Sequence, residues 1–268
     1  RAVEDAALLS LRTAVSAPQE GPFANRPRFV LLSMEALSRA EWKKLGTYGV
    51  VHNARLFLAG MIGPAPLAMV DYGYCKENLI LTATALGLNT CWLGGTFAVS
   101  AFGRAAGLDR SELLPTISPV GYAAPRPSLT DRVMRGFAGS DRRLPWEKLF
   151  FAGGPGEPLS QEKAGPFAEA LENVRLAPSA SNKQPWRLIG TEGAWHFHLK
   201  RQKGYGKGSL LFALTRIADL PRVDLGIAMC HFELAAREAG LSGRWALLNS
   251  EPLTPDASLE YTVTWLCC

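Results

Sequence analysis

Residues 70–95, VDYGYCKENLILTATALGLNTCWLGG, and residues 223–248, VDLGIAMCHFELAAREAGLSGRWALL, are the two segments on which the fold depends. Both begin with Val-Asp and continue through a long apolar stretch to Gly-Leu and then a tryptophan. Asp71 and Asp224 are 224 − 71 = 153 positions apart, and Trp92 and Trp245 are 245 − 92 = 153 apart. An ungapped match of this length indicates a duplicated unit, because helical patterning alone does not keep the same residues at both ends.

Each of the two segments has the marks of a buried helix. Asp71 and Asp224 are suitable N-caps, since an aspartate oxygen can accept an N–H of the first turn. Gly87 and Gly240 can adopt the left-handed conformation that closes a last turn. We therefore expect two equivalent helices that pack together across a pseudo-twofold axis at the centre of the molecule.

The remaining pattern predicts short strands and amphipathic helices around this centre. The expected strands are residues 28–33, 116–122, 186–191, 195–199, 245–248 and 261–266. The expected helices are residues 3–15, 36–44, 50–62, 99–106 and 166–174. The result is an α+β chain of two fused half-units, residues 1–150 and 151–268, each with a mixed or antiparallel sheet and a central helix. Residues 135–163, rich in Gly, Pro and charge, are expected to bridge them.

Composition narrows the class of protein. The formal net charge of +5 is a mild excess, and the Lys and Arg residues form no block interleaved with aromatics, so we expect no nucleic-acid partner. No apolar run approaches the ~20 residues that span a bilayer, so no membrane partner is expected. The 5 cysteines fit neither a disulfide framework nor a zinc pair, which favours a reducing cytoplasm and no metal site. The chain begins with Arg1 and not with methionine, so the sequence leaves open whether a targeting segment precedes it.

A polar, proline-bracketed loop, APSASNKQPWR at residues 177–187, directly precedes an expected strand. This string resembles the P-S-x-x-N-x-Q-P-W signature of the FMN-dependent nitroreductase family. The resemblance implies a nitroreductase-like fold in which this loop lies along the isoalloxazine and ribityl parts of FMN. Serine and asparagine supply the donors and acceptors that such a ligand needs. The residues implied are Pro178, Ser179, Ala180, Asn182 and Gln184.

Two further segments carry the resemblance. Residues 87–95, GLNTCWLGG, look like the family's G-L-G-x-x-W-[IL]-G segment, which implies that Trp92, Leu93, Gly94 and Gly95 approach the flavin near N5. A glycine turn after a helix is common in any fold, so this segment is less specific than the loop. Residues 141–148, DRRLPWEK, resemble the tail whose arginine holds the FMN phosphate, which implies Arg142 or, better, Arg143. A solvated charge is the alternative for Arg142.

The two halves have kept complementary parts of this site. The first half has SAPQEGPF at residues 16–23 where its own polar loop would stand, and the second half has lost the glycine pair in GLSGRWAL at residues 240–247. In family homodimers these parts come from different subunits. The resemblance therefore implies one composite FMN site per chain, in a monomer that acts as a pseudo-dimer. One departure is that the family's R-R-S-x-R segment, which also grips the phosphate, has no match before Ala36.

The function implied is an oxidoreductase that passes hydride from NAD(P)H through FMN to a small acceptor such as a nitroaromatic, a quinone or a flavin. FMN N5 would carry the chemistry, so no catalytic side chain is assigned. A non-catalytic flavin-binding or flavin-sensing protein is the alternative, and a paralogue that binds no cofactor is a second. Tyr48, Gly49 and His52 could lie near the ring, although a helix N-terminus accounts for them better. The other histidines, His196, His198 and His231, are assigned structural roles.

Overall fold

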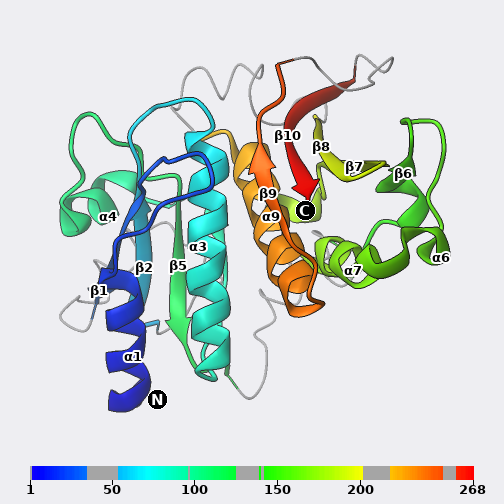
Figure 1. Ribbon diagram of the computed structural model, residues 1–268. Coiled ribbons are helices and arrows are strands. Elements are labelled where there is room, and N and C mark those ends of the chain that lie inside the picture. The colour runs from blue at the N-terminus through cyan, green and yellow to red at the C-terminus, as the bar shows by residue number, and fades with distance from the viewer. Residues whose placement is uncertain are drawn as a thin grey trace.

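Two β-sheets flank a central pair of helices (Figure 1). The computed structural model describes residues 2–34, 54–95, 97–124, 139, 142–201, 218–249 and 258–268. The expected helix at 36–44, the residues Tyr48, Gly49 and His52, and Asp141 lie outside these ranges. In the described part of the chain, no helix is both long enough and apolar enough to cross a bilayer.

The first sheet belongs to the amino-terminal half. After helix α1 (Asp5–Ser16), strands β1 (Arg28–Ser33), β2 (Leu56–Met61) and β5 (Thr116–Gly121) lie side by side and antiparallel. The short strands β3 (Asn89–Thr90) and β4 (Leu93–Gly94) both pair with β5, and helix α4 (Val99–Ala106) follows them. Every residue of β2 is buried, so this strand forms the middle of the sheet.

The second sheet has the order β6-β7-β8-β10-β9. Its strands are β6 (Phe150–Ala152), β7 (Trp186–Thr191), β8 (Ala194–Lys200), β9 (Gly243–Ala246) and β10 (Leu259–Cys267). All its pairs are antiparallel except β6 with β7, which is parallel. Helices α6 (Gln161–Ala164) and α7 (Ala168–Leu176) precede β7, and short 3-10 turns cover Trp146–Lys148, Gly165–Phe167 and Ala180–Asn182.

The two sheets share one strand order apart from β6. The path β1-β2-β5-β3, with β4 beside β3 on β5, corresponds to β7-β8-β10-β9. A long helix stands at the same place in each path: α3 (Ala68–Ala85) follows β2, and α9 (Leu220–Glu238) follows β8. This correspondence is what a duplication would produce, and the duplication itself stays a prediction.

Helices α3 and α9 lie side by side at the centre (Figure 1). A β-carbon added to Gly73 would overlap the carbonyl oxygen of Val223, and one added to Gly226 would overlap that of Val70. The two contacts are reciprocal, because 223 − 70 and 226 − 73 both equal 153. The helices can approach this closely only because both positions lack a side chain.

Each central helix also places a buried glutamate between the two halves. Glu77 Oε2 accepts the Trp92 indole N–H at 2.8 Å, and its Oε1 lies 2.8 Å from His231 Nε2 on α9. Glu233 on α9 accepts the Trp245 indole N–H at 2.6 Å and the hydroxyl of Tyr74 on α3 at 2.7 Å. Each tryptophan of the repeat is thus tied to the helix pair through a carboxylate.

Two of the expectations about these elements were wrong. Residues 56–61, expected within a helix, form β2, because the strand is buried on both faces and so lacks the polar alternation of a half-buried strand. Asp71 and Asp224 are not N-caps, since α3 begins three residues earlier and α9 four residues earlier. The left-handed glycines are confirmed, with φ of 75° at Gly87 and 74° at Gly240.

Candidate functional site

The loop at Ser179–Gln184 has an unusual backbone. Ser181, Asn182 and Gln184 have positive φ values of 50°, 52° and 45°, although none of them is glycine. Such conformations cost about 1–3 kcal/mol each and persist where surrounding contacts enforce them. The loop is therefore held in shape by specific partners, and these partners define the candidate site.

Gln184 and Ser179 close the loop on itself. The Gln184 backbone N–H donates to Ser179 Oγ at 2.9 Å, and the Leu144 N–H donates to Gln184 Oε1 at 2.8 Å. Gln184 is buried, and Pro185 and Trp186 behind it are buried as well. The second of these contacts joins the loop to the segment that contains Arg142 and Arg143.

Asn182 forms the main connection between the two segments. Its Nδ2 donates to the carbonyl oxygens of Gly139 and Arg142, both at 2.7 Å. Its Oδ1 accepts from Arg143 Nη1 at 3.4 Å and from Gln184 Nε2 at 3.2 Å. An amide has two donor hydrogens and two acceptor lone pairs, so these contacts use all of its capacity. In this structure Asn182 therefore acts within the protein, holding the arginine segment against the loop.

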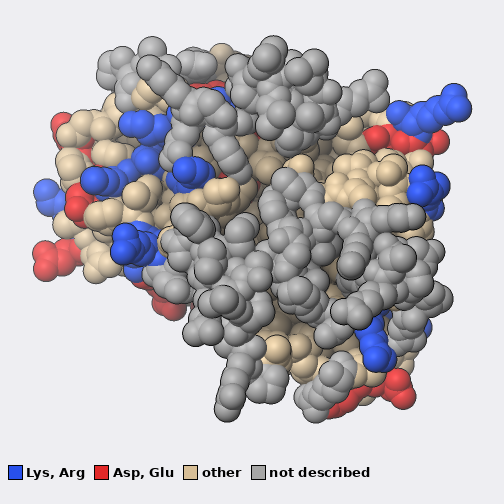
Figure 2. Space-filling model, turned by 180° about the vertical axis from the view of Figure 1, so that it is seen from behind, with Lys and Arg blue, Asp and Glu red and all other residues tan. Residues whose placement is uncertain are grey.

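Cationic side chains surround this junction. Arg143 Nε and Nη2 donate to the Leu176 carbonyl oxygen at 3.3 and 3.0 Å, while the Arg142 side chain is exposed. Arg187 Nη1 donates to the Gln184 carbonyl oxygen at 3.0 Å, and burial lowers the pKa of this guanidinium to about 10. Seen from behind, Lys and Arg gather on the side of the molecule that carries β6, α6 and α7 (Figure 2). This arrangement suits an anionic group.

Asp224 holds the loop from the side of α9. Its Oδ1 accepts the Ala180 backbone N–H at 2.9 Å, and the carboxyl is almost completely buried, with 3% of its residue surface exposed. Burial raises the pKa of Asp224 to about 8, and the charge of Asp219 acts in the same direction. Pro178 and Ala180, two of the predicted site residues, thus lie in a segment fixed against the second turn of α9.

The glycine turn reaches the first turn of the same helix. Leu93 and Gly94 pair with Ile117 and Thr116 of β5, and a β-carbon on Gly94 would lie 3.0 Å from the side chain of Leu220. Gly95 has a φ of 84°, which a side chain would disfavour. Leu220 and Asp224 are four residues apart and so lie on one face of α9. The glycine turn from the first half and the loop from the second therefore lie against adjacent turns of α9.

Lys76 lies beneath the glycine turn and was not found from the sequence. Its side chain is completely buried, its Nζ donates to Thr116 Oγ1 at 2.7 Å, and it lies 4.4 Å from the centre of the Trp92 ring. No ion-pair partner of this amine occurs within the described ranges, and burial keeps its pKa well below the usual value. The sequence held a signal in the repeat, because the equivalent residue in the second half is Met229 (76 + 153).

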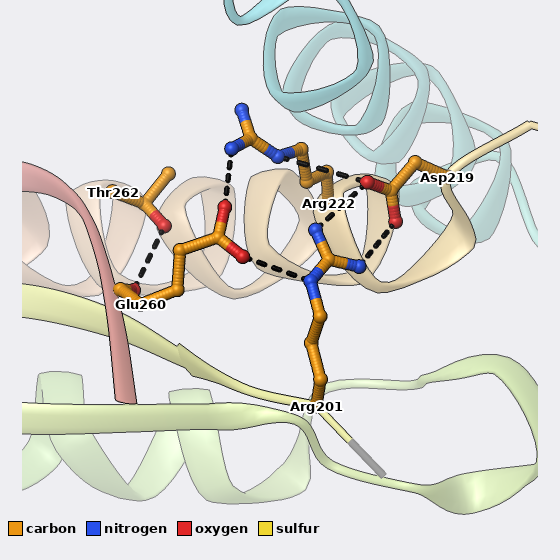
Figure 3. Close-up of polar contacts among 5 residues, drawn as sticks. All are labelled: Arg201, Asp219, Arg222, Glu260 and Thr262. Carbon is orange, nitrogen blue, oxygen red and sulfur yellow. Dashed lines mark hydrogen bonds and ion pairs between the residues drawn. The ribbon is translucent and has the colours of Figure 1, made fainter. Parts of the chain in front are cut away.

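A charge network fixes the beginning of α9 (Figure 3). Arg201, just after β8, donates two hydrogen bonds of 2.8 Å to the Asp219 carboxylate and one of 2.8 Å to Glu260 of β10. Arg222 of α9 also contacts both Asp219 and Glu260. The beginning of α9, where the glycine turn and the loop lie against adjacent turns, is therefore anchored to β10 and to the end of β8.

The structure brings together most of the predicted loop and arginine residues. One connected set consists of Ser179, Asn182, Gln184, Arg142 and Arg143. Ala180, in the same loop, links this set to Asp224 of α9. The glycine turn belongs to the first sheet and approaches that set at the first turns of α9. Its residues are Trp92, Leu93, Gly94 and Gly95. Their assignment to a single ligand site stays a prediction. Among the described residues, no cluster of His, Cys, Asp and Glu is arranged to hold a metal ion.

Comparison with known proteins adds to this geometry. Residues 31–236 match a protein-family model described as "Putative TM nitroreductase". The chain belongs to this nitroreductase family. The matched range contains helix α3, the glycine turn, the arginine segment, the loop at Ser179–Gln184 and most of α9, and it ends before β9 and β10. A search of curated proteins found no match.

Several solved structures resemble this chain to different extents. A protein from Thermotoga maritima MSB8, described as a "putative nitroreductase", is 19% identical, with a TM-score of 0.50, over 96% of this chain and 93% of its own. An FMN-dependent nitroreductase from Clostridium difficile R20291 is 16% identical, with a TM-score of 0.38, over 47% of this chain and 80% of its own. A nitroreductase with bound FMN from Bacteroides fragilis NCTC 9343 is also 16% identical, with a TM-score of 0.36, over 48% of this chain and 82% of its own. The first of these supports the α+β nitroreductase fold expected from the sequence.

Proposed function

We propose that this nitroreductase-family protein is an FMN-dependent oxidoreductase that binds one FMN per chain in a composite site. The observation that carries the proposal is the junction of Arg143 with Asn182, in which a cation and a strained polar loop are locked together. Backbone strain of this kind clusters at active sites and ligand-binding segments, which supports the proposal. Family membership and the loop's resemblance to the nitroreductase signature support the same reading.

The chemistry of the residues present fits FMN. Arg142 and Arg143 would hold the phosphate, because a guanidinium can pair two phosphate oxygens at once. Arg187 adds a desolvated cation beside the same loop. The Ser179 hydroxyl still has its hydrogen to donate to a ribityl or ring oxygen. Asn182 would position the loop and the arginine segment for the ligand, since its own hydrogen bonds are used within the chain.

The glycine turn would let backbone atoms approach the ring. Gly94 and Gly95 carry no side chain that would stand between the backbone and a flat ligand, and Trp92 beside them is held by Glu77. Bound FMN would supply the hydride chemistry at N5, with NAD(P)H as donor and a small molecule as acceptor. The chain's own residues would hold the cofactor, orient it and limit the access of water.

The absorbance spectrum of the purified protein, with flavin quantified per chain, tests the proposal. We expect a yellow protein with about one FMN per chain, where two equivalent sites would give two. Size-exclusion chromatography on the same sample should give a monomer. A colourless preparation that does not bind added FMN would overturn the proposal.

Stopped-flow mixing with NADH and with NADPH separates an enzyme from a flavin-binding protein without activity. Bleaching of the flavin absorbance with either donor, followed by its return when a quinone or a nitroaromatic is added, is expected. A flavin that stays oxidised with both donors would favour the non-catalytic alternative.

A further inference from the structure

Asp71 and Asp224 occupy equivalent places in the two central helices but differ in how they are satisfied. Asp71 accepts the backbone N–H groups of Phe23 and Asn25 and the Asn25 side-chain amide, at 2.9–3.2 Å. Asp224 accepts one N–H, that of Ala180, through Oδ1. Its Oδ2 is buried and has no hydrogen-bond partner among the described residues. One aspartate of the pair is therefore saturated, and the other is left with a free acceptor out of contact with water.

A buried carboxylate oxygen without a partner is costly when ionised, and a proton on that oxygen removes most of the cost. Nearby cations could also offset it, but Arg201 and Arg222 are both engaged by Asp219 and Glu260. Asp219 itself is an acid, and its charge opposes ionisation of Asp224. The surroundings therefore favour a neutral Asp224 in the resting protein.

The other titratable groups on the elements packed against this turn do not provide a counter-ion. The loop carries Lys183, and α7 carries Glu169, Glu172 and Arg175, of which the last two pair with each other. The groups on α3 are Asp71, Tyr72, Tyr74, Cys75, Lys76 and Glu77, and those on β7 and β8 are Arg187, His196, His198 and Lys200. The ring of Phe197 on β8 packs against Phe232 of α9. Within the described residues, Asp219 is the charged side chain that acts on Asp224.

We propose that Asp224 is a positioning residue of the candidate flavin site, and that the proton on its Oδ2 sets how firmly its Oδ1 holds the Ala180 N–H and with it the loop at Ser179–Gln184. When the Oδ2–H bond breaks and the proton passes to solvent, Oδ1 becomes part of a carboxylate. Hydrogen bonds to a charged acceptor are stronger than those to a neutral one. While Asp224 stays buried on α9, the loop is thus held loosely when the carboxyl is protonated and firmly when it is ionised.

The contact lies between the elements that the site depends on. Ala180 is two residues from Asn182, whose amide locks the Arg142–Arg143 segment, and Asp224 is one turn from Leu220, which contacts Gly94. A change in the hold on Ala180 therefore acts where the loop, the arginines and the glycine turn meet. The link to FMN rests on the proposed function, whereas the hold on the loop is a property of the protein alone.

Hydrogen exchange in the protein without added FMN tests the hold directly. Protection of the Ala180 amide, corrected for the intrinsic pH dependence of exchange, should rise about tenfold from pH 7 to pH 9 in the wild-type chain. In Asp224→Asn, whose amide keeps an acceptor but cannot ionise, protection should not change with pH. Asp71→Asn is the matched control and should keep the wild-type rise at Ala180. A flat wild-type profile, or the same rise in Asp224→Asn, would overturn the proposal.

FMN titration of the same three proteins separates this proposal from the proposed function. The wild-type chain and Asp71→Asn should bind FMN about tenfold more tightly at pH 9 than at pH 7, and Asp224→Asn should bind it equally at both. If no protein binds FMN but the exchange profiles are as expected, the cofactor assignment fails and the role of Asp224 in the loop stands. If FMN binds and the exchange profile of the wild-type chain is flat, the role of Asp224 is excluded and the cofactor assignment stands.

Discussion

Gly73 of α3 lies directly against the backbone carbonyl of Val223 in α9, with no room for a β-carbon between them. Because Gly226 has the same relation to Val70, the two central helices contact each other through both glycines. The contact couples the halves at the level of the main chain, where neither partner can move aside as a flexible side chain would.

Replacing Gly73 by alanine should therefore destabilise the protein. In a helix the substitution would ordinarily stabilise by about 1 kcal/mol, but here the added methyl group forces the helices apart. We expect a net loss of about 1–3 kcal/mol in the free energy of unfolding, measured by denaturant titration. Gly63→Ala is the control, because open space surrounds that position, and it should leave stability nearly unchanged. Equal stabilities for the two variants would contradict the close contact.

Asn182→Ala should weaken FMN binding by about tenfold, or about 1–2 kcal/mol, because it releases the arginine segment from the loop. Asn182→Asp keeps the shape and the acceptor but cannot donate to Gly139 and Arg142, and it should lose a similar amount. Fluorescence titration with FMN measures both. Ser181→Ala, at an exposed neighbouring position, should bind as the wild type does. If Asn182→Ala binds FMN normally, the junction does not contribute to the site.

Lys76→Met replaces the buried amine by the residue found at the equivalent position of the second half. The variant should be more stable by roughly 1–3 kcal/mol at pH 7, because it removes a buried amine that has no ion-pair partner among the described residues. The pKa of Lys76 is lower in the folded chain than in the unfolded chain. The wild type therefore loses stability as the pH falls from the unfolded-state pKa of Lys76 toward its folded-state pKa. The advantage of methionine should thus grow from pH 10 to pH 7. An advantage that shrinks over this range would show that the folded protein stabilises the ammonium form of Lys76.

Arg201→Met should lower the free energy of unfolding by about 1–3 kcal/mol, because Asp219 and Glu260 lose their shared partner. The matched control is Arg26→Met. Arg26 pairs with Glu20 at 2.7 Å, similar in length, but 78% of its side-chain surface is exposed. Screening by water should make that variant indistinguishable from the wild type. Thermal unfolding at low and high salt measures the stability of both variants. Equal losses of stability in Arg201→Met and Arg26→Met would mean that the network does not anchor α9.

Much of the fold could be predicted from the sequence because the pattern of the central helices repeats. The bounds expected for β1, β7 and α4 agree with the structure, since the two strands are short segments rich in apolar residues and α4 has apolar residues at helical spacing. β2 was missed because a strand buried on both faces has no alternation to read. β6 was missed because it has three residues and pairs with a strand more than thirty positions away.

The candidate site was predictable in its residue types and less so in their roles. The order of Ser179, Asn182 and Gln184 pointed to the loop, and in the structure Arg143 lies beside it, while their shared role at a ligand stays a prediction. The amide of Asn182 was expected to contact a ligand, but it bonds to main-chain groups that come close only in the folded chain. Lys76 and Asp224 gave no local signal either, since burial in the middle of a helix pair depends on tertiary packing.

Strand β6 lies at the boundary expected between the two halves and pairs with β7 of the second sheet. It precedes the whole of the second sheet in the chain, yet it covers the edge of β7 with parallel main-chain hydrogen bonds. A cut near residue 150, where the two half-units were expected to divide, would pass through this strand and uncover the backbone of β7. In fragments produced there, the unpaired main-chain groups at the edge of β7 could form hydrogen bonds with strands of other chains. Fragment complementation or circular permutation of this protein is therefore best attempted away from β6.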